Sequence, residues 1–246
     1  MISSPGKKDS SQFMLALTIA GVAFSLLVTV FGLFHVDIFL RAYRLPLQTY
    51  SFGNVVFAII NTANNFFGAW LLDSAACRTN RSDLIGISGC IFAVCFLTPF
   101  FRWKEPSSNT LDGAHFIVSM SLYDTLFSFT AILLGSLVTD NHNMNDDERV
   151  WFMASGKIAN LIAVFVVARI GLLVFDKDNM RRFRAFLVGL AVVVAFLFTV
   201  AQAMTRYSVV IQRKRFRIRF LETKRADDDA PGSTQKLKLW QAISDF

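Results

Sequence analysis

Long apolar stretches alternate with short polar segments along most of this chain. Each stretch can cross a hydrocarbon core about 30 Å thick, because a transmembrane helix needs about 20 mainly apolar residues. The six stretches cover residues 13–34, 51–72, 84–101, 115–139, 151–175 and 185–204. They predict an all-α membrane protein with six transmembrane helices and no soluble domain. We therefore look for function among the polar residues within the membrane, where they are costly.

Composition and charge agree with this prediction and suggest an orientation. The 246 residues are 54% hydrophobic and carry a net charge of +7, much of it after residue 204. A basic segment directly after a transmembrane helix marks the cytoplasmic side and anionic headgroups rather than nucleic acid. We expect a cytoplasmic N-terminus (1–12), a six-helix bundle (13–204) and a basic cytoplasmic tail (205–246), in the plasma membrane.

Motifs that would indicate an enzyme or a metal site are absent from the sequence. Cys77, Cys90 and Cys95 do not have metal-ligand spacing, and the three histidines are scattered. There is no phosphate-binding loop and no Ser/His/Asp set. The sequence therefore predicts neither an enzyme nor a resident cofactor.

Two charged side chains lie well within the predicted helices. Asp124 shares one face of the helix at 115–139 with Ser128 and Gly135. Lys157 lies about two turns into the helix at 151–175. An intramembrane carboxylate is a functional candidate and is expected to have a basic partner. The two residues could form a charge pair that lines a cavity, or a purely structural ion pair, and both interpretations stay open.

Amides and small residues mark two further helix faces. On the helix at 51–72, Asn54, Asn61 and Asn65 share one face, with Asn64 beside them. Because an unpartnered amide is costly in hydrocarbon, this face is expected to meet protein or water. The helix at 13–34 has a face of small residues, which predicts either close helix packing or a cavity lining. That face comprises Thr18, Gly21, Ser25, Thr29 and Gly32.

The helices at 84–101 and 185–204 have centres without charge and with almost no hydrogen-bonding side chain. We expect these two helices to face lipid. Four partly polar helices with two apolar ones in third and sixth place are typical of half a transporter bundle.

Five segments carry a resemblance to a known family: FHVDIFLRAY (34–43), NTANNFFGAWLLD (61–73), SLYDTLFSF (121–129), DDERVWF (146–152) and the tract from Phe183 into the basic tail. With the six helices, they resemble the major facilitator superfamily. The likeness is to its glycoside–pentoside–hexuronide:cation symporter (melibiose-carrier) branch and to the animal family called transmembrane protein 180. It implies the N-terminal half, a 3+3 inverted repeat, of a twelve-helix carrier with alternating access. A C-terminal six-helix half is then the missing partner, and this chain is a fragment or a short form.

The resemblance also implies roles for individual residues. The cation-binding acids of the second helix match Asn61 and Asn65, which supply no charge and cannot carry a proton, so Na⁺ or H⁺ coupling is doubtful. The fourth-helix acid of the sugar symporters matches Ala131, and the fifth-helix cation matches Lys157. A cytoplasmic gate is implied at four charged positions: Asp73, Arg78, Arg81 and Arg149.

Two hypotheses of function follow. The first is a secondary-active carrier of a small polar, sugar-like solute, whose path is lined by Asn61, Asn65, Asp124 and Lys157. The alternative is a non-transporting membrane scaffold or receptor on a degenerate carrier fold. Under that alternative, the basic tail binds lipid headgroups or a partner.

Overall fold

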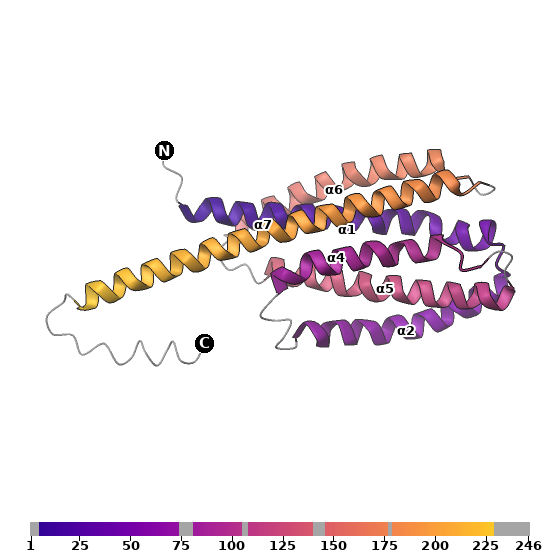
Figure 1. The fold of residues 1–246 in the computed structure, drawn as a ribbon, viewed down its shortest axis with the longest axis horizontal. Helices are drawn as coiled ribbons and strands as arrows, with labels where there is room; N and C mark the ends of the chain where they lie inside the picture. The colour runs from indigo at the N-terminus through magenta and orange to yellow at the C-terminus, as the bar shows by residue number, and fades with distance from the viewer. Residues whose placement is uncertain (1–4, 74–80, 105–107, 140–145, 177–178, 229–246) are drawn as a thin grey trace. The chain divides into compact units, whose positions relative to one another are not determined.

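The structure is a computed structural model that describes residues 5–73, 81–104, 108–139, 146–176 and 179–228, with side chains of α7 described up to residue 208 (Figure 1). The described residues are almost entirely helical and contain no strand. The six α-helices are α1 (Pro5–Asp37), α2 (Leu47–Asp73), α4 (Arg81–Leu97), α5 (Asn109–Thr139), α6 (Asp146–Val174) and α7 (Arg181–Asp228).

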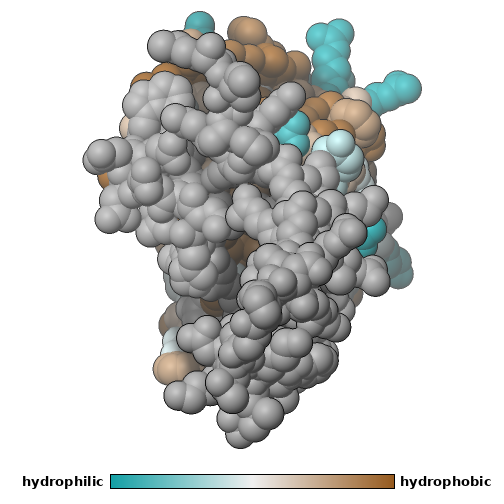
Figure 2. All heavy atoms as spheres, turned by 90° about the vertical axis from the view of Figure 1, so that its left-hand side faces the viewer, coloured by the Kyte–Doolittle hydropathy of each residue, from teal (hydrophilic) through white to brown (hydrophobic). Residues whose placement is uncertain are grey.

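Five of these helices are long and apolar enough to cross a membrane: α1, α4, α5, α6 and α7. The chain therefore has the architecture of a multi-pass integral membrane protein. Helix α2 has 27 residues, which is about 40 Å of helix. Helix α2 is not among the candidate spans found in the described residues, so its membrane crossing stays a prediction. Figure 2 shows hydrophobic side chains at the surface of the described part, as expected of helices that face lipid.

The predicted helix end at Met204 is wrong, because α7 continues to Asp228. The stretch after Met204 has no glycine or proline before Pro231 and is rich in Arg and Lys, which favour helix. The chain divides into two compact units, Met1–Arg206 and Tyr207–Phe246. The first holds α1 to α6 and the apolar part of α7, and the site described below lies within it.

The predicted link between the first two helices, residues 35–50, is too long at both ends. Helix α1 continues to Asp37 and then becomes a π-helix over Ile38–Ala42. The side chains of Ile38 and Phe39 in this π-helix are fully buried. Helix α2 begins at Leu47, directly after a proline, so only four residues connect the two helices.

Helix α1 lies at the centre of the first unit and contacts α4, α5, α6 and α7. Phe24 packs against Phe92 of α4 and Phe127 of α5, with ring centroids 5.4 and 5.2 Å apart. Phe34 packs against Phe183 of α7 at 4.8 Å. These aromatic contacts and the fully buried alanines of α1 form the apolar core.

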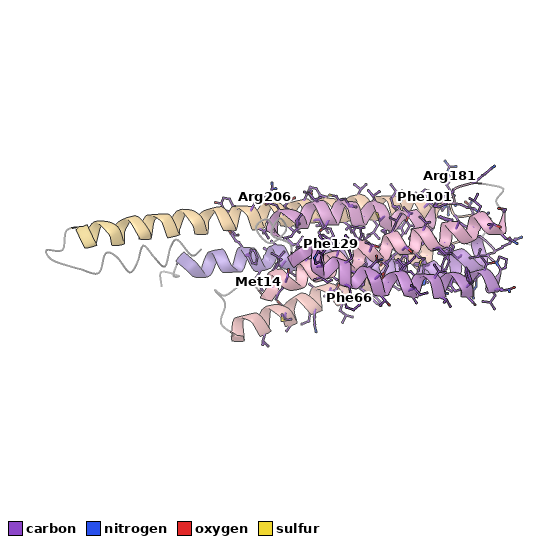
Figure 3. All side chains as sticks on the ribbon, turned by 90° about the horizontal axis from the view of Figure 1, so that it is seen from below. Met14, Phe66, Phe101, Phe129, Arg181 and Arg206 are labelled. Atoms are coloured by element: carbon purple, nitrogen blue, oxygen red, sulfur yellow. The ribbon has the colours of Figure 1, made fainter. Side chains whose placement is uncertain are left out.

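Helices α2 and α5 form a close parallel pair. Gly53 lies against Phe116, where an added Cβ would come within 2.6 Å of the ring, and Gly68 lies beside Ile132. Residue numbers rise together along both helices, so the helices run in the same direction. Figure 3 shows the outer side of α2, where Phe66 is exposed.

The expectation that the helix at 84–101 faces lipid fits only one of its sides, where Ile87, Ile91 and Val94 are exposed. Half of the residues in the most apolar part of α4 are buried inside the unit. Gly86 packs against Gln202 of α7, and Gly89 packs against Phe198 of the same helix. By contrast, only 6% of the residues in the most apolar part of α6 are buried. An apolar helix fits a protein core as well as it fits lipid, so composition alone could not separate the two environments.

Replacing Gly89 with alanine should destabilise the first unit by about 1–3 kcal/mol, the usual effect of overfilling a packed core. The added Cβ would overlap the ring of Phe198, which is fully buried and has no room to move. Thermal unfolding in detergent measures the effect. Gly189→Ala in α7 is the matched control, because a Cβ there meets nothing within 4 Å. Equal unfolding temperatures for the two variants would contradict the packing.

Candidate functional site

Asp124 lies at the middle of α5, in the interior of a helix that can span a membrane. Its side chain is 8% exposed, and its Oδ2 atom is buried without a hydrogen-bond partner. A buried carboxylate without a partner is strongly unfavourable, so it is retained only where something else compensates for it. Asp124 is therefore the first candidate for a functional residue in the described part of the chain.

The predicted pairing of Asp124 with Lys157 is wrong. Lys157 is exposed on α6, and among the described residues the two form no ion pair. Helix α1 fixes their relative levels, because its Thr18 lies beside Gly156 while its Phe24 stacks on Phe127. At 1.5 Å per residue, Lys157 and Asp124 are roughly 13 Å apart along the bundle axis.

Asp124 lies on a face of α5 that is buried at Asp124 and Ser128 and open at Gly135. Phe127 contacts α1, and Thr125 contacts α2. At 100° per residue, Asp124 and Gly135 point between these two contacts. An added Cβ on Gly135, three turns beyond Asp124, would meet nothing within 4 Å, so the open part of this face lies toward the end of α5.

Helix α1 presents a similar open face on the same side. Gly21 and Ser25 lie between Phe24, which contacts α5, and Thr18, which lies beside α6. A Cβ on Gly21 or Gly32 would meet nothing within 4 Å. The predicted close packing is thus not seen at Gly21 and Gly32, and the alternative of a cavity lining stays a prediction. We call Gly21, Ser25, Gly32, Asp124, Ser128 and Gly135 the inner face.

The hydroxyl groups on α1 do not need a partner from another helix. Thr18 Oγ1 donates to the Met14 carbonyl at 3.1 Å, and Thr29 Oγ1 donates to the Ser25 carbonyl at 2.8 Å. Hydroxyls that bond to the preceding turn of their own helix are a common way to satisfy them in membranes. The Asp124 carboxylate is therefore the strongest polar group on the inner face.

The asparagines of α2 differ in what they contact. Asn64 Nδ2 donates to Thr125 Oγ1 at 2.7 Å, and Thr125 Oγ1 in turn donates to the Ser121 carbonyl at 2.7 Å. Asn61 is half-buried and has a partner of its own. The side chain of Asn65 lies outside the described residues. Asn64 thus ties α2 to α5 next to Asp124, a role that helical periodicity did not single out.

Removing the Asn64 amide should loosen the α2–α5 pair. We expect Asn64→Ala to cost about 0.5–2 kcal/mol, the range found for interhelical hydrogen bonds in membranes. Thr62→Ala is a suitable control, because Thr62 is exposed and bonds only to the Ala58 carbonyl of its own helix. Thermal unfolding of both variants tests this, and equal losses would mean that the interhelical bond contributes nothing.

The four predicted gate residues lie at helix ends or outside the described chain. Asp73 ends α2, Arg81 begins α4, and Arg149 lies in the first turn of α6. The side chains of these three residues, and the whole of Arg78, lie outside the described residues. The cytoplasmic gate stays a prediction.

Sequence reasoning missed a polar cluster between the end of α4 and the start of α5. Arg102 Nε donates to Asp112 Oδ1 at 2.9 Å, and its second nitrogen donates to Oδ2. The guanidinium group also lies 5.4 Å from the ring centroid of Tyr43. His115 Nε2 donates to the Thr98 carbonyl at 2.9 Å. The signal available in the sequence was the pair of opposite charges, Arg102 and Asp112, ten residues apart across a short link.

The described residues contain no group of three His, Cys, Asp or Glu side chains that could hold a metal ion. In Figure 3, Phe101 and Arg181 mark the end of the unit near the Arg102 cluster, and Met14 and Arg206 lie toward its other end. The inner face with Asp124 lies between these two ends.

Comparison with known proteins gives distant relatives. Transmembrane protein 180 from Gallus gallus is 24% identical over 202 residues, which is 74% of this chain and 37% of the relative. Transmembrane protein 180 from Mus musculus is 25% identical over 186 residues, 68% of this chain and 34% of the relative. This chain thus spans about a third of the length of the curated relatives it matches. No family model matches the chain, and no solved structure does either.

Proposed function

We propose that this chain is part of a secondary-active carrier that moves a small polar solute by alternating access. The observation that carries the proposal is Asp124: an unpartnered, buried carboxylate at the middle of a helix that is long and apolar enough to span a membrane. Ionisable residues in such positions usually mark solute or ion paths. The distant kinship with transmembrane protein 180 supports a membrane protein and gives no activity.

The pairing of the helices supports the N-terminal half of a major facilitator fold. A 3+3 inverted repeat relates α1 to α5 and α2 to α6, so an α2–α5 contact must be matched by an α6–α1 contact. Both contacts are present and are among the most extensive in the first unit. Carriers of this kind bind solute near the midplane between two halves, which agrees with the depth of Asp124.

A second six-helix half is the proposed partner. The curated relatives are nearly three times as long as the segment they share with this chain. Helix α6 is almost entirely exposed and carries Lys157, which is unfavourable against lipid. A second half, or a water-filled path beside it, would remove that cost. We propose that both termini lie on the cytoplasmic side of the plasma membrane, because basic residues come directly after Met204.

Reconstitution of the complete protein tests the carrier proposal. Proteoliposomes should accumulate at least one member of a panel of labelled amines, sugars, amino acids and organic anions. Uptake should saturate with solute concentration and should be absent from empty liposomes. No uptake of any panel member, with or without Na⁺ and proton gradients, would refute the carrier.

The second candidate is a membrane scaffold, and the continuous helix of α7 favours it. The backbone stays helical from Arg181 through the basic segment to Asp228, which extends a membrane helix by several positively charged turns. Such a helix could bind anionic headgroups. Exchanging Arg213, Arg215 and Arg217 for glutamine should then reduce binding to phosphatidylserine-containing vesicles. Unchanged vesicle binding together with active transport would exclude the scaffold.

A further inference from the structure

We propose that His115 is a pH switch between α4 and α5: its neutral imidazole holds the two helices together, and its protonation releases them. The switch lies where α4 ends and α5 begins, beside the Arg102 cluster. It concerns how this end of the unit opens, and it does not depend on which solute the proposed carrier moves.

One nitrogen of His115 joins the two helices. Its Nε2 donates at 2.9 Å to the carbonyl of Thr98, in the 3-10 helix η2 (Thr98–Phe100) that follows α4. The last carbonyl groups of a helix have no partner within it, so a donor from outside stabilises them. Arg184 of α7 acts on the same turn, because its Nε donates to the Phe100 carbonyl at 3.1 Å. Side chains from two other helices thus hold the end of α4.

The other nitrogen of His115 has no partner to receive a proton's hydrogen bond. The side chain is 1% exposed, and Nδ1 is buried without a hydrogen-bond partner among the described residues. Because Nε2 carries the proton of the neutral ring, Nδ1 carries a lone pair. Protonation would create an N–H group at Nδ1 and a positive charge on the ring. Burying a donor without an acceptor is unfavourable, and burying an unpaired charge is more so.

The groups packed around His115 do not supply a free counter-charge. The rings of Phe39 and Tyr43, from the end of α1, lie 5.7 and 5.8 Å from the imidazole, and the Trp103 ring lies at 5.1 Å. The neighbouring charged groups among the described residues are Arg102 and Asp112. Arg102 already donates to both carboxylate oxygens of Asp112, and its guanidinium lies over the Tyr43 ring. A protonated His115 would therefore place two cations beside one buried carboxylate.

The closed corner is therefore expected to weaken in acid. A histidine that is free in water takes up its proton near pH 6.5. The closed state excludes that proton, so the contribution of His115 is complete above about pH 6.5 and is lost as the pH falls below it. Uptake of one proton on opening shifts the opening equilibrium about tenfold for each pH unit in that range. With both termini in the cytoplasm, as proposed, this end responds to acidity on the opposite side of the membrane.

The experiment measures amide hydrogen exchange of the complete protein in lipid nanodiscs, corrected for the intrinsic exchange rate. Between about pH 7.5 and about pH 5.5, residues 94–100 and 112–118 should exchange about tenfold faster, because one proton is taken up when the corner opens. Residues 84–90, at the other end of α4, should keep their protection. Phe101 marks the end that should open in Figure 3.

Two variants identify the group that takes up the proton. His115→Gln keeps an N–H donor for the Thr98 carbonyl and cannot be protonated, so its exchange should not change with pH. His35→Gln is the matched control, because His35 is half-buried and its Nδ1 donates to the Phe31 carbonyl of its own helix. This control should retain the tenfold acceleration of the unaltered protein.

The unaltered protein alone can overturn the inference, even if a variant folds poorly. Equal exchange of residues 94–100 and 112–118 at both pH values would mean that protonation does not open the corner. Equal acceleration along the whole of α4 would mean that acid loosens the entire unit rather than this contact. A tenfold acceleration that persists in His115→Gln would assign the proton to another group. Each of these three results contradicts the switch, and none of them changes the test of solute uptake.

Discussion

Replacing Arg102 with methionine is expected to destabilise the six-helix unit by about 3–5 kcal/mol, the usual cost of breaking a buried ion pair from one side. The Arg102 side chain is 19% exposed and that of Asp112 is 5% exposed, so the loss leaves the carboxylate charged and out of water. The pair also joins the start of α5 to the segment after α4, and Tyr43 packs on the guanidinium from the end of α1. Thermal unfolding in detergent measures the change.

A double-mutant cycle shows whether this loss comes from the pair itself. Arg102→Met together with Asp112→Leu should recover much of the stability, because it leaves no unpaired charge behind. Arg206→Met is the matched surface control. Arg206 pairs with Asp83 at 2.6 Å, but these side chains are 55% and 39% exposed, so we expect a loss below about 1 kcal/mol. Similar losses for Arg102→Met and Arg206→Met would contradict the buried pair.

The sequence predicted the helices well because their signal is local. Runs of about 20 apolar residues mark the membrane helices whatever they pack against, and five of the six meet the length and hydropathy of a span. Helix ends were less accurate where composition changed without a helix breaker. The basic residues after Met204 look like a tail in composition, yet α7 stays helical through them to Asp228.

The candidate site was predicted only in part, because partners depend on how the helices pack. Helical periodicity placed Asp124, Ser128 and Gly135 on one face, and the structure agrees. It could not show that α1 stands between Asp124 and Lys157, which requires the contact of Thr18 with Gly156. It also gave Asn64 no special role, because the bond to Thr125 depends on the register of two helices.

The prediction for the third helix was accurate for only one of its sides, for a similar reason. An apolar helix surface is compatible with lipid and with a protein core, since both lack water. Gly86 and Gly89 were the signal that α4 packs closely, because glycine lets another helix approach its backbone. The mainly exposed helix is α6, whose Lys157 had suggested a buried position. In both cases, the identity of the neighbouring helix decides the environment.

Replacing Asp124 with leucine is expected to abolish transport and, at the same time, to stabilise the protein. The substitution removes a buried carboxylate whose Oδ2 has no partner, so the folded state loses an unfavourable charge. Replacing buried charges with apolar side chains often stabilises proteins by about 1–4 kcal/mol. Uptake by proteoliposomes should fall to the level of empty liposomes, while the unfolding temperature rises by several degrees.

Asp112 of the same helix gives this experiment its matched comparison. Asp112 and Asp124 are both more than nine-tenths buried, but Asp112 accepts two hydrogen bonds from Arg102. Asp112→Leu should therefore lower the unfolding temperature, whereas Asp124→Leu should raise it. A fall for Asp124→Leu would mean that this carboxylate has a structural partner, and it would leave the carrier without its main support. Opposite signs would separate a residue retained for folding from one retained for function, since selection keeps a destabilising charge only where it does something else.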